Sequence, residues 1–331
     1  MTAAARLFLA LLLALPTLAT AWGQVRTTAF LIEFLNVPEQ RRPLSAITPE
    51  PVRRALGPRI DLYASPALRR PPGLVLVHGL SPEGKDDPRL QQAARLLARA
   101  GWAVAVPTVD GLTVLRLRPE DAGAVVATVR ALEGAGYRPA VLGVSLGAGP
   151  ALLAAADPSV AAHVTAVLAL GGYASATELL RFSLTGAYAF GDESGRGAVH
   201  EDAVTQFARA NAALVDDAGR RLVDNRDPAA FDRLVAGLPP STRALLDALS
   251  PDRVLGAVQA PLFLIHGRQD PAVPFTESRR LATAARAAGR PVRLAIVGAV
   301  THVEAGRRAA GLADLARLWA VFYAFRRAAG G

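Results

Sequence analysis

The stretch Ala-Val-Leu-Gly-Val-Ser-Leu-Gly-Ala-Gly-Pro-Ala-Leu-Leu-Ala-Ala-Ala (residues 140–156) decides the fold. Its pentapeptide Gly143-Val144-Ser145-Leu146-Gly147 lies between an apolar run and an alanine-rich helical stretch. A Gly-x-Ser-x-Gly sequence in that context is typical of a sharp strand-to-helix turn that exposes a nucleophilic serine. The pentapeptide alone is weak evidence for a nucleophilic serine, because ordinary Gly and Ser usage gives roughly 0.1 chance matches in a chain of this length. Ser145 is therefore a candidate nucleophile, and a small residue in a tight turn is the alternative.

Working outward from this turn, short apolar runs alternate with helical stretches. Continuous apolar strands are expected when helices cover both faces of a parallel sheet. The pattern predicts an α/β fold with a mostly parallel, doubly wound sheet. The expected strands are 74–78, 102–107, 140–144, 165–170, 261–266 and 292–297, and the expected helices are 88–100, 119–135, 146–156, 276–288 and 312–328.

The alternation breaks between residues 175 and 258, which show helical periodicity, many charges and no convincing strand. We expect a helical insertion that caps the carboxyl ends of the strands, where open α/β sheets bind ligands. The alternative is an insertion that lies beside the sheet and takes no part in ligand binding. The predicted organisation is a signal peptide or anchor at 1–21, a lead-in at 22–72 with one strand-like piece at 59–64, a catalytic domain at 73–174 and 259–331, and the cap at 175–258.

The N-terminus resembles an export signal. Arg6 precedes the apolar run 7–15, and Ala19-Thr20-Ala21 is a small-x-small cleavage pattern. We expect a periplasmic or extracellular protein. Apolar residues continue to Trp22 and recur at 29–35, so an uncleaved segment that associates with the membrane is one alternative. A cytoplasmic protein with a buried N-terminal helix is the other.

Composition narrows the function classes. The net charge of +9 comes from 37 basic residues, of which only Lys85 is lysine, and the arginines are scattered. This favours a compositional bias over a nucleic-acid-binding stripe. The chain has no cysteine, which excludes a disulfide and a thiolate nucleophile. No HExxH, GxGxxG or P-loop pattern occurs, so neither a metal nor a nucleotide cofactor is implied. Oligomeric state is not indicated.

A serine hydroxyl needs a histidine to take its proton and a carboxylate to orient that histidine. Asp270 follows the expected strand 261–266, and His302 follows the expected strand 292–297. The two residues are 32 positions apart, enough for one helix and one strand. Asp270 is alternatively a turn former, and His302 a loop cap. The other histidines, none of which follows the last strand, are His78, His163, His200 and His266.

The chain resembles the α/β-hydrolase family, especially its dienelactone-hydrolase-like and prolyl-oligopeptidase-like branches. The resemblance runs from Leu74 to the C-terminus, except for the insertion. It rests on His78-Gly79, on 143–147, on 267–274 with Asp270, and on His302. Dienelactone hydrolases use cysteine at the turn, so Ser145 points instead to esterase, lipase or peptidase chemistry. A serine there also disfavours haloalkane dehalogenation, which needs a carboxylate.

The resemblance also implies an oxyanion hole. Leu146 would donate one backbone N–H, because it follows the nucleophile. The family pattern suggests Leu80 for the second donor, with Gly79 allowing close approach of the chain. His78 is expected to make a structural hydrogen bond rather than to take part in catalysis.

These residues predict a serine hydrolase that cleaves a small-molecule ester, or less readily an amide, through an acyl-enzyme on Ser145. An acyltransferase of the cell envelope and a catalytically silent binding protein with the same fold are the alternatives. The sequence does not identify the substrate. Aromatic residues that suit an apolar acyl pocket, and suit the core equally, are Phe182, Tyr188, Phe190 and Phe207.

Overall fold

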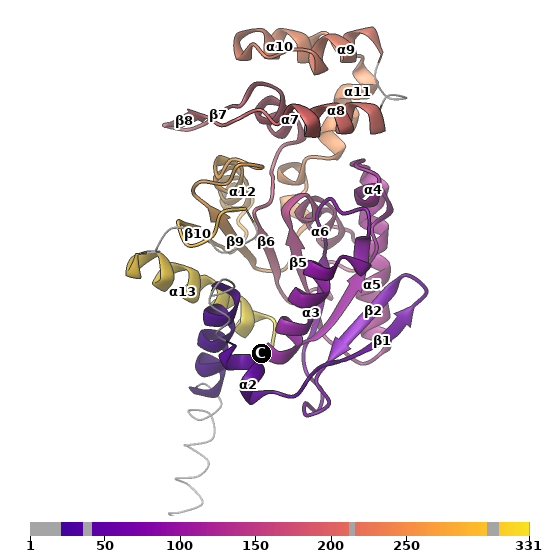
Figure 1. Cartoon of the computed structure of the whole chain (residues 1–331). Coiled ribbons are helices and arrows are strands. Elements are labelled where there is room, and N and C mark those ends of the chain that lie inside the picture. Colours follow the sequence, from indigo (N-terminus) through magenta and orange to yellow (C-terminus); the bar gives the residue numbers. More distant parts are fainter. Residues whose placement is uncertain (1–20, 36–41, 212–215, 303–310, 331) are drawn as a thin grey trace, which may run out of the picture.

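A computed structural model of the chain describes residues 21–35, 42–211, 216–302 and 311–330. Its centre is an eight-stranded sheet in the order β1-β2-β4-β3-β5-β6-β9-β10 (Figure 1). The pairs β1–β2 and β2–β4 are antiparallel, and all the other pairs are parallel. The strands are β1 (Val52–Gly57), β2 (Ile60–Ala64), β3 (Gly73–Val77), β4 (Ala103–Pro107), β5 (Pro139–Val144), β6 (Val167–Leu170), β9 (Leu262–Gly267) and β10 (Val292–Val297).

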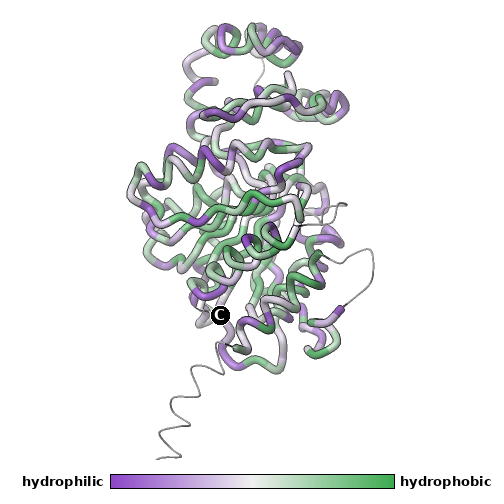
Figure 2. The backbone as a smooth tube through the Cα atoms, turned by 90° about the vertical axis from the view of Figure 1, so that its left-hand side faces the viewer, coloured by the Kyte–Doolittle hydropathy of each residue, from purple (hydrophilic) through white to green (hydrophobic). Residues whose placement is uncertain are grey.

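Helices cover both faces of this sheet, as a doubly wound fold requires. One face packs against α5 (Ala122–Gly134), α6 (Ala148–Ala155) and α12 (Thr276–Ala287). The other packs against α3 (Pro88–Ala100), α13 (Leu312–Ala328) and a helix over residues 21–35. Hydrophobic residues concentrate in the middle of the molecule (Figure 2). Two short helices, α2 (Pro43–Ile47) and α4 (Asp110–Thr113), lie in connections.

Local sequence signals set the ends of these helices. At the start of α3, the Asp87 side chain accepts the N–H of Arg89 and Pro88 occupies the first turn, where its missing donor costs nothing. The helix ends at Gly101, whose φ of +121° suits only glycine. Asp87 therefore caps the N-terminus of α3.

The helix over residues 21–35 lies against α13 on the outer layer. The rings of Phe30 and Phe322 stack with centroids 4.6 Å apart, and Trp102 meets Phe322 edge-on. Among the described residues, no helix is both long and apolar enough to cross a bilayer. The predicted cleavage signal lies almost wholly in residues 1–20, outside the described part of the chain.

The lead-in 22–72 contributes more than the single strand predicted for it. Both β1 and β2 join the central sheet at its antiparallel edge. The apolar pattern misses β1 because its first four residues, which include Arg53 and Arg54, are exposed on an edge strand. An edge strand that is exposed on both faces has no apolar run in its sequence by which it could be predicted.

The insertion forms a separate layer above the sheet (Figure 1) around a small core of its own. The expectation that it holds no strand is wrong, because β7 and β8 pair as an antiparallel hairpin that turns at Gly191, with φ +59°. Four-residue strands are too short to show an alternating pattern. The elements of this layer are α7 (Ala176–Thr185), β7 (Ala187–Phe190), β8 (Glu193–Arg196), α8 (Glu201–Ala210), α9 (Asp217–Val223), α10 (Pro228–Ala236) and α11 (Pro240–Ala248).

Candidate active site

Ser145 stands on a strained turn between β5 and α6. Its φ is +54°, in the left-handed region that non-glycine residues rarely adopt. The two flanking glycines explain how the turn closes. A Cβ at Gly143 would lie 2.5 Å from the Cα of Ala148, and a Cβ at Gly147 would lie 2.1 Å from the carbonyl oxygen of His78. The pentapeptide therefore needs both glycines for packing.

This packing predicts that Gly147→Ala destabilises the fold and lowers activity together. The added methyl group meets a backbone carbonyl that cannot rotate away, so the turn must shift from the end of β3. We expect the free energy of unfolding in urea to fall by about 1–3 kcal/mol. Gly123→Ala is the matched control, because a Cβ there meets nothing within 4 Å and alanine suits a helix. Equal stability and activity in the two variants would contradict the account of this turn.

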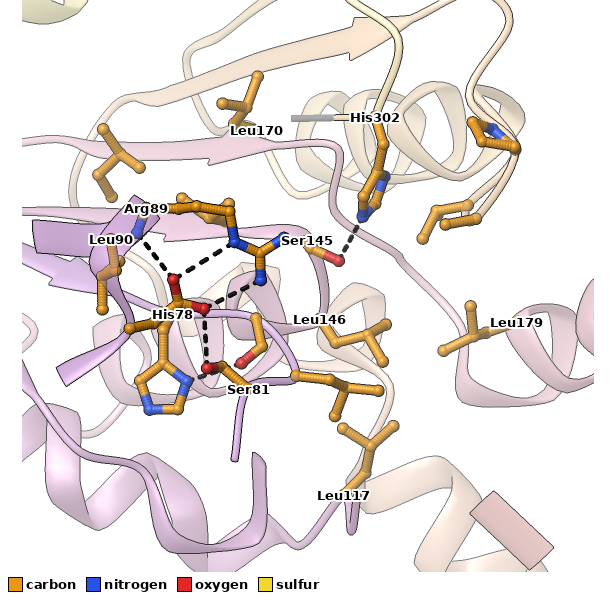
Figure 3. Close-up of a pocket in the computed structure, with 18 of the residues that line it drawn as sticks. His78, Ser81, Arg89, Leu90, Leu117, Ser145, Leu146, Leu170, Leu179 and His302 are labelled. Carbon is orange, nitrogen blue, oxygen red and sulfur yellow. Dashed lines mark hydrogen bonds and ion pairs between the residues drawn. The ribbon is translucent and has the colours of Figure 1, made fainter. Parts of the chain in front are cut away.

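The fold brings the three predicted side chains together. The Nε2 atom of His302 lies 2.6 Å from the Oγ atom of Ser145 (Figure 3), and its Nδ1 atom lies 2.7 Å from Oδ2 of Asp270. Asp270 follows β9 and His302 follows β10, and these strands pair in parallel. Their carboxyl ends therefore meet at one edge of the sheet, where β5 also ends.

Asp270 is fixed by four donors. Its Oδ1 accepts the N–H groups of Ala272 and Val273 at 2.8 and 2.9 Å. Its Oδ2 faces His302 and also lies 3.3 Å from Nε2 of His266. Burial pushes the pKa of this carboxyl upward, but the hydrogen bonds from His266 and His302 outweigh burial and lower the pKa to about 2. The carboxylate is therefore ionised near neutral pH.

The depressed pKa of Asp270 predicts an acid-sensitive fold. Its folded value of about 2 lies below the ordinary value of about 3.9, so its contribution is complete above roughly pH 4 and is lost as the pH falls to 2. The side chain is inaccessible to solvent, and the loss is about 2–3 kcal/mol. Urea unfolding between pH 5 and pH 2.5 measures it. Asp270→Asn should show a shallower decline, and an identical decline would refute the assignment.

His266 is the residue that sequence reasoning missed. It is fully buried, its Nδ1 atom lies 2.7 Å from Oγ of Ser278, and its Nε2 atom lies 2.9 Å from the carbonyl oxygen of Val273. These partners place the ring proton on Nε2, so His266 donates toward Val273 and Asp270. Its position at the end of β9, four residues before Asp270, was the available signal.

The loop after β3 lies against the serine. The backbone N–H of Val109 donates to Nε2 of His78, so Nδ1–H donates to the carbonyl of Gly79 at 2.6 Å. Burial lowers the pKa of His78, which favours its neutral form. A Cβ at Gly79 would lie 3.0 Å from the Cβ of Ser145. His78 thus makes the structural hydrogen bonds expected of it.

A large cavity opens beside these groups. Its volume is about 1360 Å³, and its wall includes Leu80. Ser145, Leu146 and His302 also line it (Figure 3). Both predicted donor residues therefore border the same space as the serine, and their donor role stays a prediction. Tyr173 belongs to the core, where its hydroxyl donates to the carbonyl of Leu249. In the described ranges, no group of three or more histidine or acidic side chains is placed to hold a metal ion.

One protein family and several solved structures are similar to this chain. Residues 237–324 match the prolyl oligopeptidase family. A search of curated protein sequences finds no match. A puromycin hydrolase aligns with a TM-score of 0.56 at 18% identity, over 88% of this chain and 41% of its own. A puromycin-hydrolyzing peptidase of Mycobacterium tuberculosis aligns with a TM-score of 0.55 at 20% identity, over 86% of this chain and 41% of its own.

A truncated carbohydrate esterase from gut microbiota aligns with a TM-score of 0.51 at 15% identity, over 82% of this chain and 91% of its own. The chain thus spans less than half of each puromycin-hydrolysing enzyme and most of the esterase. Identities this low establish a common fold and not a common substrate. The chain has the α/β-hydrolase fold, and its residues 237–324 are similar to the prolyl oligopeptidase family.

Proposed function

We propose that this protein hydrolyses a carboxylic ester through an acyl-enzyme on Ser145. The observation that carries the proposal is the hydrogen-bonded series from Ser145 through His302 to an ionised Asp270. A serine linked to an imidazole that is itself held by a buried carboxylate is the arrangement that activates a hydroxyl group.

The first half-reaction forms the acyl-enzyme. His302 Nε2 takes the hydroxyl proton while Ser145 Oγ bonds to the carbonyl carbon, and Asp270 stabilises the resulting imidazolium without taking a proton. The backbone N–H groups of Leu146 and Leu80 hold the negative charge on the carbonyl oxygen. The bond to the leaving oxygen then breaks, and His302 returns the proton to the departing alcohol.

The second half-reaction releases the acid. A water molecule gives a proton to His302 and attacks the acyl carbon. The bond to Ser145 Oγ breaks and the hydroxyl recovers its proton from His302. If another alcohol replaces water, the same steps transfer the acyl group to it. This is the chemical basis of the acyltransferase alternative.

Two measurements test the proposal. A fluorophosphonate probe should label the protein once, at Ser145, and p-nitrophenyl acetate should give a burst of about one equivalent of nitrophenol. Product analysis with competing alcohols separates hydrolysis from acyl transfer. Absence of both label and burst from the folded protein would leave the silent binding protein as the surviving alternative.

We also propose that the protein is exported and stays near the membrane through its N-terminal segment. Support comes from the apolar run 7–15 and from Trp22, Val25 and Ile32, which lie exposed on the helix that follows. Cell fractionation with N-terminal sequencing tests this. A start at residue 22 in a soluble extracytoplasmic fraction would establish cleaved export, and an intact protein in the cytoplasm would refute the proposal.

A further inference from the structure

The insertion turns an uncharged surface toward the serine. The described residues that it contributes to the cavity include no carboxylate, guanidinium or ammonium group, although the outer faces of α9 and α10 carry exposed charges such as Asp217 and Asp232. Most of the residues that the insertion contributes to the cavity are aliphatic or aromatic. They include Leu179, Phe182, Val204, Leu222, Leu245 and Leu246.

A wall of this kind selects against charged substrate groups. A buried ammonium or carboxylate without a partner costs several kcal/mol, because it exchanges water for hydrocarbon. An unblocked amino acid beside the scissile bond therefore finds no ion-pair partner on the insertion wall. For a methylene chain, in contrast, the burial of each carbon makes binding more favourable.

The cavity is also larger than a short acyl group needs. Its volume of about 1360 Å³ exceeds the roughly 300–1,000 Å³ typical of sites for drug-sized ligands. On the far side of the serine the lining is mixed, because Leu170, Ile265 and Phe322 share it with charged side chains such as Asp87 and Arg89. The insertion is therefore the side of the cavity that offers an uncharged wall to a long chain.

We propose that the substrate is an ester of a long aliphatic acid, whose chain lies under the insertion along α7 and α11. This inference rests on the hydrolase proposal above and adds the class of substrate. The ester carbonyl would lie at Ser145, and the chain would extend from it along Leu179 and Leu245. Short acyl groups would leave most of this wall without a partner.

A series of p-nitrophenyl esters from acetate to decanoate, used below their aggregation concentrations, tests the inference. Each added methylene should raise kcat/KM by up to about fourfold until the chain fills the cavity. Decanoate has about six more methylenes than butyrate, so even about a twofold gain for each one makes decanoate better by roughly sixtyfold in kcat/KM. A flat profile, or a preference for acetate or aminoacyl amides, would overturn the inference while Ser145-dependent turnover left the hydrolase proposal intact.

Two neighbouring positions on α11 provide a matched pair of variants. Leu245 lines the cavity, whereas Ala244 is exposed and contributes nothing to it. Leu245→Trp should reduce the preference for decanoate over butyrate at least tenfold, since an indole fills the path of the chain. Ala244→Trp should leave the whole profile unchanged. An equal effect of the two substitutions would contradict the assigned path.

A binding measurement distinguishes the proposed chain site from the proposed hydrolase activity. In Ser145→Ala, calorimetry with p-nitrophenyl decanoate and butyrate measures recognition of the chain without turnover. Tighter binding of decanoate, weakened by Leu245→Trp, supports the chain site even if the wild-type protein hydrolyses no ester. In that case the hydrolase proposal fails alone. Equal binding of the two esters would remove the chain site.

Discussion

Ser145→Ala and His302→Ala should each lower kcat/KM for p-nitrophenyl butyrate by about 10⁴-fold or more. The first substitution removes the atom that bonds to the acyl carbon. The second leaves the hydroxyl without an acceptor for its proton, since His302 Nε2 is the group found 2.6 Å from it. Steady-state kinetics measures both losses.

The double variant gives this prediction its sharpest form. Groups that act as one unit are not additive, so Ser145→Ala with His302→Ala should be no slower than either single variant. Circular dichroism should remain close to that of the wild-type protein, because neither side chain belongs to the hydrophobic clusters. His302→Ala should lose part of the stability that Asp270 contributes, because it removes one of the hydrogen bonds to that buried carboxylate. A single variant that keeps more than a tenth of the activity would refute the mechanism.

Asp270→Asn should cost about 10³–10⁴-fold in kcat/KM through a change of tautomer. The native carboxylate receives backbone N–H groups on Oδ1 and imidazoles on Oδ2. An asparagine has one acceptor oxygen and one donor nitrogen for these two sides. If its oxygen keeps the backbone donors of Ala272 and Val273, its NH₂ faces Nδ1 of His302. That ring must then carry its proton on Nε2, where it cannot accept one from Ser145.

A surface carboxylate supplies the control for this substitution. Asp110 is an exposed residue at the start of α4 that pairs with Arg59, and it does not line the cavity beside Ser145. Asp110→Asn should leave kcat/KM within about twofold of the wild-type value. Fluorophosphonate labelling should slow strongly in Asp270→Asn and stay unchanged in Asp110→Asn. Near-normal turnover in Asp270→Asn would mean that another group orients His302.

The sequence predicts well the elements that are buried on one or both faces. The strand Val292–Val297 and the helices Pro88–Ala100 and Leu312–Ala328 have the expected bounds. Other strands differ from expectation by one or two residues. Each of these segments shows its burial as an apolar run or a helical stripe. The exposed edge strand β1 and the short hairpin β7–β8 bury too little to leave such a signal.

The candidate site likewise has features that the sequence predicts and features that it does not. The positions of Ser145, Asp270 and His302 at strand ends were predictable, because topology alone brings those ends to one sheet edge. The contact of His266 with Asp270 was not, since it depends on the path of the chain through Val273 and Ser278. The shape of the cavity depends on how two layers meet, and local patterns do not encode that.

The backbone at Ser145 carries a consequence for how this protein can evolve. A side chain at φ +54° costs about 1–2 kcal/mol that glycine would not incur. Under selection for heat resistance alone, position 145 would drift toward glycine and the turn would relax, but the proposed nucleophile would be lost. Selection for stability and selection for activity therefore favour different residues at position 145.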